Sequence, residues 1–397
     1  MESLVDIISS STKDIPIAKA LCASTIVSYL LIVRYFRHRT LNKFLQTVRN
    51  ECGIVTKSSD LSISHAEQAV KLMGAWDFPR ITRLALQFAL FRTYGIPTIS
   101  SILWKTRQLA QRSTAHRRYV DTSVLIIELM SSPLDSPRAK IAIERINYLH
   151  SRHKNSISND DLLYTLALFM CQPPVFINKY EWRKLHPVEL MGIHRFWSQV
   201  GVMMGITGIP DSFEGTNVAT ATLDILLYFV PKFMHSTATP VVHAVCDQRL
   251  RESFYWPDPP KWIEPVVNGF FGVRAFCMRN FVLPRFKKHT AIQLDPIDPS
   301  VPLLERRYYF NLWETDPWYL KRTWWNSYGP IGWLCIAMGW GIPNEEEFGS
   351  VHGYRIGDLG PRSTIGKGAA NDGWDHGSLL GGGTIIESSG KCPMFGG

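Results

Sequence analysis

The stretch from Ser136 to Pro210 constrains the fold more than any other part of the chain, because it reads as consecutive helices. Its first segment carries apolar side chains at helical spacing up to His150, at Ala142, Ile143, Ile146 and Leu149. A helix-start signal at Ser158 then precedes the apolar run LLYTLALFM, and the run FWSQVGVMMGITGIP follows. We therefore expect three successive helices, with one histidine on an apolar helix face.

The rest of the N-terminal sequence gives further helix signals and no long alternating strand pattern within the first 250 residues. Capping residues and periodic apolar residues predict helices over 62–76, 78–95, 99–112 and 119–130. In the C-terminal third, prolines separate short aromatic segments, and the apolar run GPIGWLCIAMGWGIP could be core or a membrane-facing entrance. We predict an all-α fold.

Composition limits the classes of partner. The 397 residues are 45% hydrophobic, which is enough for a substantial core, and 43 basic against 34 acidic residues give a net charge of +9. Such a charge suits nucleic acid or an anionic membrane surface, and the lack of zinc-knuckle spacing or an RRM-like motif argues against nucleic acid. The seven scattered cysteines contain no CxxC pair, which indicates a reducing compartment.

An apolar stretch from Ile15 to Phe36 has the length of a membrane span, since 22 residues at about 1.5 Å each cross a layer of about 30 Å. The residues before it are net acidic, which disfavours a cleaved signal peptide, and an ordinary amphipathic or core helix is the alternative. Arg34, Arg37, Arg39 and Lys43 follow, so the positive-inside rule predicts a cytosolic body.

We divide the chain into a lumenal N-terminus (1–14), a transmembrane anchor (15–36), a helical catalytic body (37–345) and a flexible Gly/Ser-rich tail (346–397). If the source is eukaryotic, this organisation predicts a single-pass protein of the endoplasmic reticulum membrane.

Polar side chains stand on two apolar helix faces. Arg118 and Thr122 share a stripe with Leu125 and Leu129, and Asp121 lies at its edge. Arg118 could act in chemistry or could pair with Glu128 or Glu144 and only tie helices together. His150 lies near the apolar arc of its helix, with His153 at the helix end. Either histidine could be a metal ligand or a packed core residue.

These segments also resemble a known family. HRRYVDT, INYLHSRHK, SISNDDLLYTLALF, KYEWRKL and FWSQVGVMMGITGIP occur in the order and spacing of the fungal membrane-bound oxygenases of the mycophenolic acid pathway (MpaB-like). That family shares its catalytic domain with bacterial rubber oxygenases, the latex-clearing proteins. The resemblance implies a globin-like bundle of helices around a haem pocket, preceded by one transmembrane helix.

The resemblance also implies roles for particular residues. His150 matches the proximal histidine that holds a b-type haem through its iron, and Arg118 and Thr122 match the Arg and Thr of a distal Arg-x-x-Lys-Thr element. Here Asp121 replaces the lysine of that element, and an aspartate could only accept hydrogen bonds or shuttle protons. Trp182, Phe196, Trp197, Met203 and Met204 are expected to line the pocket or to pack helices.

Two functions remain open. The first is a membrane-anchored haem oxygenase that uses dioxygen to cleave a carbon–carbon double bond of an apolar prenyl or terpenoid substrate in secondary-metabolite biosynthesis, with Arg118, Asp121 and Thr122 as catalytic residues. The second is a non-catalytic, membrane-tethered helical protein that binds an apolar ligand or a pathway enzyme. Both predict a membrane partner and no nucleic acid.

Overall fold

The structure is a computed structural model that describes residues 2–109, 111–209, 241–242, 244–245, 258–313, 316–338, 340–343 and 352–368. For residues 2–18, 112 and 113 it describes the backbone alone. The described residues confirm the all-α prediction, because their one sheet is a pair of two-residue strands, β1 (Arg307–Tyr308) and β2 (Tyr354–Arg355).

The longer helices follow one another closely in the first half of the chain. Their bounds are α1 (Glu2–Arg37), α2 (Arg39–Cys52), α3 (Ile63–Lys71), α4 (Pro79–Thr93), α5 (Pro97–Thr106), α6 (Arg112–Ser131), α7 (Pro137–Ser151), α8 (Asn159–Tyr180) and α9 (Pro187–Met203). A π-helical turn, η2 (Leu72–Asp77), continues α3. Further along the chain lie α13 (Ile263–Asn280), α14 (Trp324–Ser327) and α15 (Pro330–Met338).

The helix starts follow from the capping residues that the sequence offers. The Ser136 hydroxyl accepts a hydrogen bond from the backbone N–H of Ala139 and begins α7. Ser158 and Asp161 form a reciprocal capping box at the start of α8. Both helices therefore begin where the sequence predicted, whereas α5 ends early because Arg107 adopts a left-handed φ of 56°.

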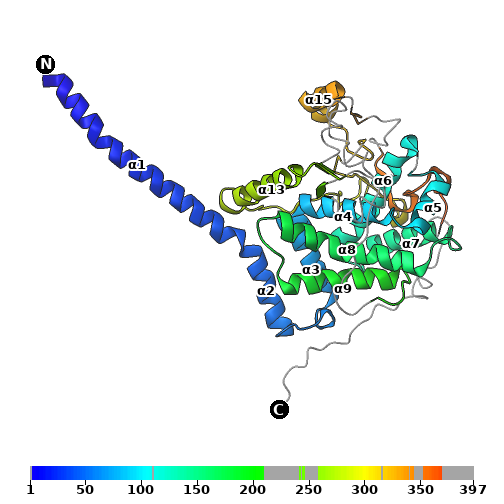
Figure 1. The fold of residues 1–397 in the computed structure, drawn as a ribbon. Helices are drawn as coiled ribbons and strands as arrows, with labels where there is room; N and C mark the ends of the chain where they lie inside the picture. The colour runs from blue at the N-terminus through cyan, green and yellow to red at the C-terminus, as the bar shows by residue number, and fades with distance from the viewer. Residues whose placement is uncertain are drawn as a thin grey trace, which may run out of the picture.

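Helices α3, α4, α6, α7, α8 and α9 form the bundle that holds the core (Figure 1). Helix α4 packs on α8, α3 packs on α9, and α6 packs on α7. Large side chains at these contacts are fully buried, Phe91, Phe196 and Trp197 among them. The bundle thus holds α6 and α7, which carry the predicted site residues, in direct contact.

Helix α1 projects away from this bundle (Figure 1). Among the described residues, Lys19–Cys52 is the one helical stretch that is long and apolar enough to cross a membrane. Only 6% of its apolar 18-residue window is buried. Leu21 and Leu31 are 64% and 62% exposed. An apolar helix with so little protein around it is not a core helix of this structure.

The predicted flexible tail needs correction. Residues 352–368 of it are described, and they pack against the bundle, with Tyr354, Leu359 and Thr364 buried. The Arg145 guanidinium of α7 donates hydrogen bonds to the backbone carbonyls of Leu359 and Lys367, at 2.6 and 2.7 Å. A segment with only two short 3-10 helices, η5 (Ile356–Asp358) and η6 (Arg362–Thr364), and the two-residue strand β2 is thus held by a buried cation. Residues 369–397 lie outside the described part.

Two apolar helices of the C-terminal third are exposed. In α15, Trp333 and Leu334 are 71% and 55% exposed, so the core reading of this run is wrong for these side chains. Helix α13 was missed at the sequence level, where residues 262–286 read as short aromatic segments. Apolar residues all around it, together with two glycines, hide the helical period.

Candidate active site

Helices α6 and α7 bring three of the predicted residues to one cavity. Arg118 and Thr122 on α6 and His150 on α7 line an inner cavity of about 130 Å³ inside the bundle. Its other walls come from α8, α9 and Leu90 of α4 and are apolar except for Thr165, with Leu166, Phe169, Trp197 and Val200 among them. The site is therefore assembled from the helices that the sequence predicted around His150.

An outer cavity of about 420 Å³ adjoins the inner one. The two share five lining residues, Arg118, Leu149, His150, Leu162 and Thr165. The outer walls come from α5 and from Pro361, Ser363 and Thr364 of the C-terminal segment. Sequence reasoning missed both of these walls, because nothing local in either segment indicates a pocket.

His150 is positioned as a metal ligand would be. Its ring lines both cavities, whereas His153 is exposed and lines only the outer one. Burial, with the nearby positive charges of Arg118 and His153, lowers the pKa of His150 to about 4. The imidazole is therefore neutral at physiological pH, which is the form that binds a metal.

Arg118 is held by Thr122. Its Nη1 donates to the Thr122 hydroxyl at 2.5 Å, and that hydroxyl donates to the Arg118 carbonyl at 2.9 Å. Burial lowers the pKa of Arg118, and Asp121 and Tyr94 oppose this effect. Glu128 does not pair with Arg118, since it accepts hydrogen bonds from Arg138 at 2.5 and 2.8 Å. Arg118 thus faces the cavity as a fixed cationic donor.

Asp121 is placed elsewhere. It is fully buried, lines neither cavity, and accepts hydrogen bonds from the Tyr319 hydroxyl at 2.8 Å and the Gly360 N–H at 3.1 Å. Burial raises the pKa of its carboxyl, against the charge of Arg117 3.9 Å away. Asp121 therefore stays outside the cavity that Arg118, Thr122 and His150 line, although its charge acts on Arg118, and its contacts attach the C-terminal segments to α6.

The inner cavity offers a metal one protein ligand, His150. Among the described residues no group of three or more His, Cys, Asp or Glu side chains could hold a metal ion, so a metal at His150 would need its other ligands from a group that carries them, as a porphyrin does. Trp197 lines the inner cavity with its indole N–H buried and unpartnered. Met204 also lines this cavity, while Phe196 and Trp182 pack in the core.

Comparison with known proteins decides the family. The chain is 32% identical over 384 residues to the ER-bound oxygenase mpaB' of Penicillium brevicompactum, covering 86% of this chain and 88% of that protein. It is also 32% identical to the ER-bound oxygenase mpaB of the same fungus, over 81% of this chain and 82% of the relative. The chain belongs to the MpaB family of ER-bound oxygenases. No family model and no solved structure matches it.

Membership of the MpaB family makes the chain an oxygenase and disfavours the non-catalytic alternative. A third relative, the ER-bound oxygenase mpaB of Penicillium roqueforti (strain FM164), is also 32% identical, over 58% of this chain and 88% of its own length. The resemblance found in the sequence is thereby confirmed, whereas the cofactor and the substrate are not identified by these names.

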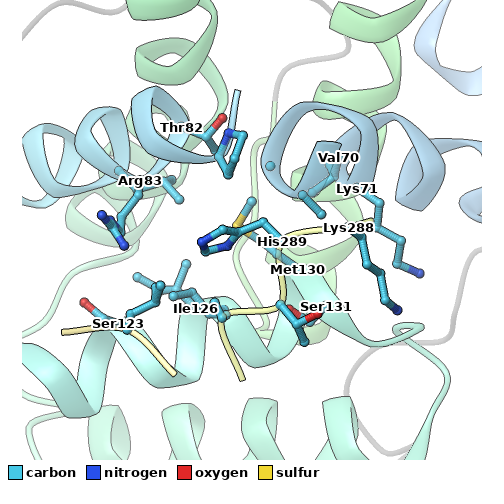
Figure 2. Close-up of a pocket in the computed structure, with 18 of the residues that line it drawn as sticks. Val70, Lys71, Thr82, Arg83, Ser123, Ile126, Met130, Ser131, Lys288 and His289 are labelled. Atoms are coloured by element: carbon cyan, nitrogen blue, oxygen red, sulfur yellow. The ribbon is translucent and has the colours of Figure 1, made fainter. Parts of the chain in front are cut away.

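Figure 2 shows a further cavity of this MpaB-family protein, of about 430 Å³. Its walls are α4, the π-helical turn η2, α6 and residues 288–294, and Leu90 and Ile126 line both cavities. His289 occupies the middle of the view, with Arg83 on one side and Lys71 and Lys288 on the other. None of its described lining residues is acidic, so its charged lining side chains, Lys71, Arg83 and Lys288, are all basic.

Proposed function

We propose that the chain is a membrane-anchored, haem-dependent oxygenase that oxidatively cleaves a carbon–carbon double bond of an apolar prenyl or terpenoid substrate in secondary-metabolite biosynthesis. One observation carries the proposal: a neutral imidazole, His150, and a fixed guanidinium, Arg118, line the same buried cavity. Membership of the MpaB family supports the oxygenase class.

His150 would hold haem b through its iron, because burial keeps the imidazole neutral, which is the form that binds a metal. When bound, haem would supply the activation of dioxygen for the oxidation of an alkene. Arg118 presents charged N–H donors to the cavity and would stabilise negative charge that develops on oxygen. Thr122 orients that guanidinium, and the apolar walls from α8 and α9 exclude water.

The substrate would be apolar because the cavities around α6 are mostly apolar. Their walls carry Leu90, Ile126, Leu129 and Phe169 among other apolar side chains. An apolar chain lying in the 430 Å³ cavity would reach the inner cavity past Leu90 and Ile126, which line both. Such a substrate partitions into a bilayer, which agrees with an anchored enzyme.

The anchor would be a single pass through the endoplasmic reticulum membrane, with the catalytic body in the cytosol. The helix passing through Lys19 has the required length and exposure, and Arg34, Arg37 and Arg39 follow its apolar run. Basic residues concentrate on the cytosolic side of membrane helices, so the bundle belongs on that side.

The visible spectrum of the detergent-solubilised full chain tests the cofactor. We expect a Soret band that His150→Ala abolishes and that His153→Ala retains, because only His150 reaches the inner cavity. A colourless protein that does not take up haem would refute haem dependence. Iron in elemental analysis without a Soret band would indicate a site without porphyrin.

Incubation of the coloured protein with a prenylated phenol and labelled dioxygen tests the reaction. Cleavage of the double bond predicts two carbonyl products, each carrying one labelled oxygen atom, in mass spectrometry. A hydroxylated product with the same number of carbon atoms as the substrate would show that the enzyme oxidises the substrate without cleaving it.

A further inference from the structure

Helix α13 exposes an apolar stripe along its whole length. The exposed side chains recur every three or four residues and so share one helix face. They are Trp262 (64% exposed), Val266 (58%), Phe270 (66%), Val273 (66%) and Phe276 (59%), with the exposed Cys277 completing the row. Contiguous exposed apolar surface of this kind marks an interaction site.

The opposite face of α13 is fixed to the bundle. Ile263 and Val267 are buried, and the ring of Phe271 lies 4.4 Å from that of Tyr180 on α8. Arg274 pairs with Glu181 at 2.9 Å. The helix is therefore held with its second apolar face pointing away from the protein.

This stripe continues directly onto the membrane helix. The Tyr29 hydroxyl of α1 donates a hydrogen bond to the Phe281 carbonyl at 2.8 Å, and the rings of Phe36 and Phe286 are 6.1 Å apart. Figure 1 shows α13 beside the end of α1 that enters the bundle. Whatever covers α1 therefore also lies against the end of α13.

The contact between Tyr29 and Phe281 also sets the depth of the end of α13 relative to the membrane surface. Tyr29 precedes Arg34, the first basic residue after the apolar run, by five positions, which is about 7.5 Å along a helix. Interfacial helices bury their apolar face by about 5–10 Å. The C-terminal end of α13, at Phe281, thus lies where an interfacial helix would lie.

The charges around the stripe match a lipid surface. No acidic residue occurs between Glu264 and Asp295, whereas this stretch carries five basic ones. Arg274 and Arg285 are bonded to the bundle, and Arg279, Lys287 and Lys288 are exposed. Anionic headgroups of the cytosolic leaflet attract such basic residues next to a membrane-embedded segment. A second copy of the chain would bring the same positive charge and would be repelled.

We propose that α13, together with residues 281–286, lies in the cytosolic face of the bilayer as a second membrane contact beside α1. This inference rests on the membrane anchor proposed above. The next residues, from Lys288 to Leu294, form a wall of the 430 Å³ cavity, so the contact places that cavity next to the lipid phase. An apolar substrate dissolved in the bilayer then enters the protein without crossing water.

Spin labelling of the full chain in nanodiscs of phosphatidylcholine and phosphatidylserine, one protein per disc, tests this contact. Native Cys277 reports the stripe, native Cys22 reports α1, and Ile54→Cys, at a position 90% exposed, reports water. Each is labelled as the single cysteine, with the others replaced by serine. Collisions with oxygen should exceed collisions with a nickel chelate at Cys277 and Cys22, and the order should reverse at Ile54→Cys.

If the label at Cys277 behaves as in water while the label at Cys22 behaves as in lipid, the proposal for α13 is wrong and the membrane anchor is retained. If both positions are water-like, the anchor itself fails and the proposal fails with it. Amide exchange over residues 262–283 in the same nanodiscs provides a check without labels. It should accelerate in Phe270→Asp/Phe276→Asp and stay unchanged in the matched surface variant Ile54→Asp.

Discussion

Asp121 allows a structural role to be tested against a chemical one, because the resemblance in sequence implied a catalytic role, whereas the carboxyl lies outside the inner and outer cavities. Asp121→Ala removes the acceptor of two buried donors, the Tyr319 hydroxyl and the Gly360 N–H. Each unsatisfied donor costs about 1–3 kcal/mol, so the free energy of unfolding should fall by about 2–6 kcal/mol. Thermal unfolding of the solubilised protein measures this loss.

Asp121→Asn is the matched control. Its side-chain oxygen can accept from Gly360 N–H, and its amide can donate to the Tyr319 oxygen, so both contacts survive. Burial raises the pKa of the native carboxyl, and such a group contributes stability at low pH that is lost as the pH rises through its folded pKa. Relative to Asp121→Asn, the native protein should therefore become less stable from about pH 4 upward.

Turnover of Asp121→Asn should equal that of the native enzyme at a temperature where both are folded. A variant that keeps its stability and its Soret band but loses turnover would show that Asp121 shuttles protons, and the structural assignment would be wrong.

Three further variants test other parts of the site. Arg118→Lys keeps a positive charge but loses the planar donor fork, so turnover should fall roughly 100-fold in a steady-state assay while the Soret band persists. Unchanged turnover would show that Arg118 does not take part in the reaction. Glu128→Ala leaves the buried Arg138 without its carboxylate, so the free energy of unfolding, measured by thermal unfolding, should fall by about 3–5 kcal/mol. A loss below about 1 kcal/mol would contradict a buried ion pair at this position. Arg145→Met removes the donors that hold Leu359 and Lys367, so limited proteolysis should cut residues 359–367 while the bundle stays intact. Resistance equal to that of the native chain would mean that other contacts hold this segment.

Sequence patterns were sufficient where the information is local. The caps at Ser136 and Ser158 and the apolar arc before His150 predicted α7 and α8, since helix starts and periodicity depend on neighbouring residues. The same periodicity placed Arg118 and Thr122 on one stripe, and the structure has both in the inner cavity. Asp121 shows the limit of this reasoning, because a residue at the edge of a stripe can turn to either side.

Other features depend on partners far along the chain. The order of residues 352–368 comes from Arg145, more than 200 positions earlier, and composition alone made this stretch read as flexible. Helix α13 was missed for a related reason: the sequence shows apolar residues on every side, whereas the structure shows that one side packs on α8 and the other stays exposed. An amphipathic pattern does not reveal a helix whose exposed face is apolar as well as its buried face.

The wall that Pro361, Ser363 and Thr364 give to the outer cavity has a consequence for biosynthesis. His150 leaves the ribosome 211 residues before Pro361, which at about 5–20 residues per second is a delay of about 10–40 s. During that time the outer cavity lacks this wall beside His150. A cofactor of the kind proposed for His150 would therefore have a window for binding while translation continues, which the arrival of the last segment, fastened by Arg145, would close.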